Sequence, residues 1–124
     1  MKDLFGYIKL GRLKKNIADQ INRKPADIFI EYNYLRHIEK GKYFILDQFG
    51  INALAYVQKI VSNFTEIREG QGEALLLVAY IEESTRQNIV VIELQPIADT
   101  SIYIVKTAMP RRRFIESEVV IWQK

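Results

Sequence analysis

The second half of the chain contains four apolar, β-branched runs, and this pattern constrains the fold more than any other feature of the sequence. The runs are EALLLVAYIEE (73–83), NIVVIEL (88–94), SIYIVKTAM (101–109) and SEVVIW (117–122). The polar segments between the first three are short enough for antiparallel neighbours, so we expect a four-stranded antiparallel meander. The central runs are apolar at odd and even positions alike. This indicates either burial on much of both sheet faces or one face that holds an apolar-walled cleft.

The first half of the chain has the spacing of helices. Four apolar residues recur at helical intervals and predict an amphipathic helix over residues 10–22: Leu10, Leu13, Ile17 and Ile21. A strand (27–32), a short helix (32–41) and a third helix (51–64) are expected to follow. The sequence therefore predicts an α+β fold in which N-terminal helices pack on a four-stranded antiparallel β-sheet, within a single domain of residues 1–124.

Composition excludes several classes of function. The chain has no cysteine and one histidine, so thiol chemistry, disulfides and multi-histidine metal sites are ruled out, and no metal or cofactor is expected. It has no apolar run of membrane-spanning length and no signal-peptide pattern at its start, so we expect a cytoplasmic protein without a membrane partner. The net charge of +3 is mild, but the cations gather in two clusters. The denser cluster is Arg111, Arg112 and Arg113; the other is Arg12, Lys14 and Lys15.

His37 is the first candidate for chemistry, because it is the only side chain of the sequence with an unperturbed pKa near neutral pH. One interpretation is a packed histidine whose ring bonds a backbone carbonyl. The other is a general acid or base. Arg36 and Lys42 lie within five residues and provide a setting that attracts anions, which favours the second interpretation.

Lys106 and Thr107 end the third strand run. Because strand residues alternate between faces, Val105 and Thr107 are expected on one face and Ile104 and Lys106 on the other, unless a bulge intervenes. In one interpretation Thr107 is an ordinary strand residue and Lys106 reaches to solvent from an edge. In the functional interpretation one of the two contacts phosphate. Pro110 is expected to stop the strand.

The three arginines follow directly after this strand. All are expected to be exposed, and a solvated charged loop is the common meaning of such a run. The functional interpretation is phosphate binding, because a guanidinium group matches two phosphate oxygens at once.

Several segments taken together resemble the phage-associated branch of the barnase–EndoU–colicin–RelE-like nucleases. They are KLGRLKKNIADQI, YLRHIEKGK, YVQKIVSNFTEI and the ending YIVKTAMPRRRF…VVIW, and the resemblance covers roughly residues 7–122. It rests on the layout, on a histidine followed by isoleucine in a helix, and on the VKTA-P-R ending. The resemblance implies a barnase/RelE-like fold, RNA as partner, and an immunity or antitoxin protein as a candidate partner.

The same resemblance implies a metal-independent endoribonuclease, acting as a toxin or as a phage or mobile-element effector. In such enzymes a 2′-hydroxyl attacks the adjacent phosphate, with a base, an acid and cationic groups assisting. By this likeness His37 and Thr107 are catalytic, as is Arg111 or Arg113. With the basic surroundings added, we expect Arg111 and Lys106 to be catalytic, and the RNA-binding residues to be Arg36, Lys42, Arg112 and Arg113. Many relatives carry a second histidine where this chain has Lys42, which is a poor base near neutral pH. The alternative is a catalytically silent RNA- or protein-binding module of the same fold.

Overall fold

The computed structural model describes residues 6–40, 52–80, 87–97, 99–111 and 113–124. Within these residues the chain forms three helices and seven strands. In chain order they are β1 (Tyr7–Leu13), α1 (Lys15–Gln20), β2 (Ala26–Glu31), α2 (Tyr32–Lys40), α4 (Ala53–Asn63), β3 (Glu66–Glu69), β4 (Leu75–Tyr80), β5 (Gln87–Ile97), β6 (Thr100–Arg111) and β7 (Val120–Gln123).

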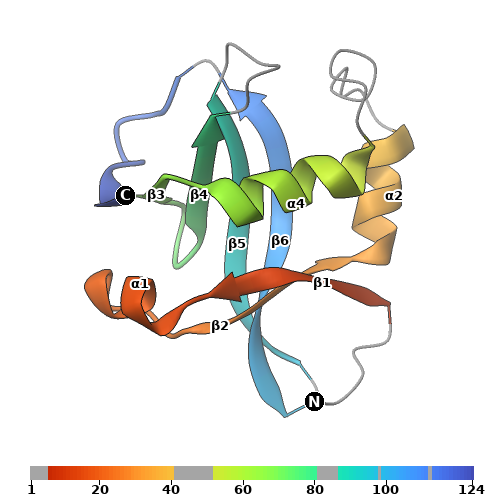
Figure 1. The fold of residues 1–124 in the computed structure, drawn as a ribbon, viewed down its shortest axis with the longest axis horizontal. Coiled ribbons are helices and arrows are strands. Elements are labelled where there is room, and N and C mark those ends of the chain that lie inside the picture. The colour runs from red at the N-terminus through yellow and green to blue at the C-terminus, as the bar shows by residue number, and fades with distance from the viewer. Residues whose placement is uncertain (1–5, 41–51, 81–86, 98, 112) are drawn as a thin grey trace.

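All seven strands belong to one sheet, in the order β1-β2-β6-β5-β4-β3-β7 (Figure 1). Only β2 and β6 are parallel neighbours; the other pairs are antiparallel. The fold is thus a mixed α+β fold. The prediction of helices on a four-stranded antiparallel sheet is wrong, because the sheet is larger and contains a parallel pair.

The predicted meander is correct for three of its four strands. β4 pairs with β5 and β5 with β6, as their short connections require. The fourth run is misplaced, because β7 pairs with β3 instead of lying beside β6. Residues 113–119 carry the chain back across the sheet, and Phe114 packs there against apolar residues of β4 and β5. Pro110 does not stop β6 as expected, since it pairs with Asn88 inside the strand.

The predicted helix over 10–22 is wrong in its first part, which belongs to β1. The pairing of β1 with β2 shifts between Lys9 and Gly11, so Leu10 is the extra residue of a β-bulge. A bulge changes the alternation of side chains. Leu10 and Leu13 therefore both enter the core from a strand, at a spacing that imitates one face of a helix.

The remaining helices and the strand before them were predicted within a few residues. β2 lies within the predicted strand, apart from one residue at its start, and α2 and α4 occupy the described parts of the predicted helices. Asn52 begins α4, because its side chain accepts a hydrogen bond from the Ala55 N–H at 2.8 Å. β3 was not predicted: it is only four residues long, and Glu66 and Arg68 give it a charged appearance.

The core lies mainly between the helices and one face of the sheet. α4 contacts β1, β4 and β5, and α2 contacts β2 and α4. Two smaller apolar clusters lie on the other face, one around Phe29, Ile102 and Ile104, the other around Leu76 and its neighbours. The central strands are therefore buried on much of both faces, which was the first of the two interpretations. Among the helices that the structure describes, none is long and apolar enough to cross a membrane.

Candidate functional site

A β-bulge in β6 determines where two of the predicted site residues lie. Thr107 pairs with Val91, and Val105 pairs with the next residue of β5, Ile92. Lys106 is therefore an extra residue without a partner in the ladder, and its side chain is exposed. Because a bulge interrupts the alternation of side chains along a strand, Lys106 and Thr107 can both contact one ligand.

The bulge also separates Thr107 from the core. Val105 and Ala108 are both buried in the main core on the helix side of the sheet. Thr107 precedes Ala108, so by alternation it lies on the opposite face, with Met109. The expectation that Val105 and Thr107 share one face is therefore wrong. Thr107 is half-buried, on the face of the sheet that also carries Met109.

α2 presents His37 and Arg36 to solvent. Leu35 and Ile38 enter the main core and fix the face of α2 that packs against the sheet. His37 and Arg36 are exposed, and the His37 ring stacks on Tyr34 with ring centroids 6.0 Å apart. His37 is therefore not the packed histidine of the first interpretation.

The structure does not join the predicted catalytic residues by direct contacts. Between His37 and each of Lys106, Thr107 and Arg111, no hydrogen bond or ring contact occurs within the described part of the chain. α2 packs with the helix layer, whereas Thr107 and Arg111 belong to the other face of the sheet.

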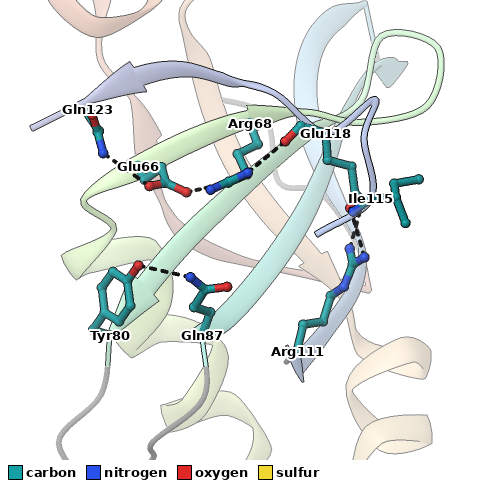
Figure 2. Close-up of polar contacts among 8 residues, drawn as sticks. All are labelled: Glu66, Arg68, Tyr80, Gln87, Arg111, Ile115, Glu118 and Gln123. Atoms are coloured by element: carbon teal, nitrogen blue, oxygen red, sulfur yellow. Dashed lines mark hydrogen bonds and ion pairs between the residues drawn. The ribbon is translucent and has the colours of Figure 1, made fainter. Parts of the chain in front are cut away.

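Arg111 is held by a carboxylate of its own chain. Its two terminal nitrogens donate to the two carboxylate oxygens of Glu118, both at 2.8 Å, as Figure 2 shows. Its guanidinium carbon also lies 5.3 Å from the centroid of the Phe114 ring, while that of Arg68 lies 3.9 Å from the same centroid. The Arg111 side chain is only 22% exposed. The expectation that all three arginines are exposed is therefore wrong for Arg111.

These contacts form a clamp, which we define as Arg68, Arg111, Phe114 and Glu118. Arg68 donates to the Glu118 carbonyl at 3.0 Å, so both arginines hold the segment that returns across the sheet. Arg68 also forms an ion pair with the buried Glu66 of β3. The clamp thus holds the segment between β6 and β7 and engages the Arg111 charge. Figure 2 shows three of its members, Arg68, Arg111 and Glu118.

The electrostatics of Glu118 follow from the clamp. Partial burial raises the pKa of the Glu118 carboxyl, but this effect is outweighed. Hydrogen bonds from Arg111 and the Ile115 N–H, and the charges of Arg111 and Arg68, together hold that pKa below its ordinary value. Glu118 is therefore anionic near neutral pH and neutralises Arg111.

Three further cations were predicted to bind RNA, and the structure describes one of them. Arg113 follows the end of β6 and is exposed. Lys42 and Arg112 lie outside the described residues. No group of three or more metal-binding side chains occurs among the residues that the structure describes.

Sequence reasoning missed the clamp, although its members are visible in the sequence. Glu118 was read only as the start of a strand run, and Arg68 was not assigned a role. No local pattern links Glu118 to Arg111, because their contact depends on the return of the chain across the sheet. A carboxylate five residues after the end of the arginine cluster is the one available signal, and it is weak.

In comparisons with known proteins, no family model, no curated protein and no solved structure matches this chain.

Proposed function

We propose that the protein binds RNA through exposed groups along β6 and at its exit, within the cytoplasm. The observation that carries the proposal is the bulge, which leaves Lys106 exposed beside the Thr107 hydroxyl on the strand that leads to the exposed Arg113. Lysine, arginine and hydroxyl groups are the usual donors to nucleic-acid phosphates. Arg111 does not belong to this surface, since Glu118 neutralises it.

Binding is favoured over catalysis by the position of His37. General acid–base catalysis requires a side chain within hydrogen-bond reach of the proton that it moves, and its partners must be close enough to act on the same phosphate. His37 makes no described contact with Lys106 or Thr107, and Arg111, which was predicted to be catalytic, is engaged by Glu118. Phosphate binding requires only the exposed cations.

The salt dependence of RNA affinity tests the proposal. Each cation that contacts a phosphate of single-stranded RNA contributes about −0.7 to the slope of log affinity against log salt concentration. Lys106→Ala and Arg113→Ala should each make that slope shallower by about this amount in an anisotropy titration with labelled single-stranded RNA. Lys24→Ala is the matched control, because Lys24 is exposed but lies outside β6 and its exit. Slopes that are unchanged in both variants would exclude this surface.

Metal-independent cleavage is the second candidate, and it rests on the bulge together with the exposed His37. Under this candidate His37 accepts the 2′-hydroxyl proton at its own surface, the 2′-oxygen bonds the adjacent phosphorus as the bond to the 5′-oxygen breaks, and the departing 5′-oxygen takes a proton from water. Products would then end in a 2′,3′-cyclic phosphate, and chelator would have no effect. His37→Ala should lower the cleavage rate by about 10²–10⁴-fold, the usual contribution of a positioned acid or base, while RNA affinity stays the same. If RNA remains intact in the presence of the unmutated protein, cleavage is excluded and RNA binding remains as the proposed function.

A further inference from the structure

A groove of about 520 Å³ lies between the two edges of the sheet, and no residue of β6 is among its described lining residues. Leu10, Gly11 and Arg12 of β1 line one side, and Trp122 of β7 lines another. β1 and β7 are the first and last strands in the sheet order, so the sheet curls far enough to bring both of its edges to one groove. Residues of α1 and of the end of α4 complete the walls.

The groove is cationic. Three cations line it, Arg12, Lys14 and Lys124, and no Asp or Glu is among the described residues of its walls. Arg12 is paired with Asp27 at 3.0 Å, which neutralises one of the three charges. Lys14 and Lys124 are exposed, so the groove retains positive charge for an anionic ligand.

The groove also has an aromatic and apolar side. Trp122 is half-buried and meets Phe64 edge-on, with ring centroids 5.6 Å apart, which restrains the indole. Leu10 and Val61 are buried beneath the groove. Gly11 permits the close approach of β1 to α4, because a Cβ at this position would lie 3.2 Å from a methyl carbon of Val61.

We propose that this groove binds a nucleotide, with its base against Trp122 and its phosphate held by Lys14 and Lys124. The volume fits a small-molecule site, for which about 300–1,000 Å³ is typical. An indole suits any nucleobase because every base has a π-face, and the lysines suit the phosphate. An inorganic anion would make no stacking contact with Trp122, and an apolar ligand would make no ionic contact with the two lysines. The nucleotide can be free or an unstacked residue of single-stranded RNA.

Trp122 provides the test, because it is the only tryptophan of the chain. A base stacked on its indole quenches its fluorescence, so adenosine 5′-monophosphate and a single-stranded oligoadenylate should each give saturable quenching. Ribose 5-phosphate, which lacks the base, should compete with them but cause no quenching. Controls with free tryptophan correct for absorption by the nucleotides.

The exposed lysines can be substituted without changing Trp122, whose fluorescence is measured, or the buried core. Lys14→Ala combined with Lys124→Ala should raise the Kd for adenosine 5′-monophosphate by roughly five- to tenfold, as expected for the loss of charge-assisted contacts at an open site. Lys24→Ala, an exposed cation outside the groove, should leave this Kd unchanged. The two Kd values are compared in protein that carries both Lys106→Ala and Arg113→Ala, so that binding at β6 does not contribute. If the oligoadenylate then binds at least roughly tenfold more tightly than the mononucleotide, the ligand is an RNA strand. Equal Kd values identify the free nucleotide.

Three results would overturn the proposal: no saturable quenching by either ligand, equal quenching by ribose 5-phosphate, or a Kd that is unchanged in the double variant. None of these results bears on RNA binding at β6, which is measured by the separate effects of Lys106→Ala and Arg113→Ala. The two proposals can therefore fail independently.

Discussion

At the scale of single residues, the role of Arg111 is decided by a residue that lies seven positions later. Glu118 binds both terminal nitrogens of Arg111 and makes it part of the clamp. The sequence could indicate that Arg111 is a cation at a strand exit. It could not indicate the partner, because the contact exists only when the chain returns across the sheet toward β3.

The clamp makes the stability of the protein depend on pH. The pKa of Glu118 is lower in the folded protein than in the unfolded chain. Its contribution is therefore fully present above the ordinary pKa of a glutamate and is lost as the pH falls through the lowered pKa. Urea unfolding at a series of acidic pH values should show this loss in the unmutated protein.

Glu118→Gln removes the charge and should remove this part of the pH dependence. Near neutral pH the variant should be less stable by about 1–3 kcal/mol, which is typical for hydrogen bonds to charged groups that are partly buried. Glu116→Gln is the control, since Glu116 is exposed in the same segment. Equal effects of the two substitutions would show that the clamp does not stabilise the fold.

At the scale of elements, two bulges explain two of the differences between expectation and structure. Leu10 in β1 produced a helical spacing from a strand, and Lys106 in β6 moved Thr107 to the other face. A bulge has no reliable sequence signature, because any residue type can occupy the extra position. Long periodic segments such as α4 were predictable, since their apolar stripe extends over several turns.

Deletion of Lys106 is a sharp test of the bulge. Without the extra residue, Val105, Thr107 and Ala108 alternate regularly, and each keeps the face it now has. The deletion variant should therefore fold with a thermal unfolding temperature close to that of the unmutated protein. Its RNA affinity should fall if Lys106 contacts phosphate.

Deletion of Val90 in β5 is the matched control. Val90 is fully buried and belongs to a strand without an extra residue, so its loss moves neighbouring side chains to the wrong face. This variant should lose most of its stability. If the Lys106 deletion were equally damaging, the extra residue would be required for the fold itself.

At the scale of the whole molecule, the α+β class was predictable and the sheet was not. The adjacency of β4, β5 and β6 follows from short connections, which operate locally along the chain. The parallel pairing of β2 with β6, and the position of β7 beside β3, join segments that are distant in sequence. Such pairings depend on how the layers close over a shared core. The groove was missed for the same reason, although the cluster of Arg12, Lys14 and Lys15 was visible.

The curl of the sheet has a consequence for the order of events during folding. Because Leu10 and Trp122 come from opposite ends of the sequence, the groove between them has among the longest loop closures in the molecule. A chain still emerging from the ribosome cannot form it until β7 has been made. We therefore expect the local β4–β5–β6 meander to form earlier and the groove to close late. Any activity of the groove would then be absent from a nascent chain until β7 has left the ribosome.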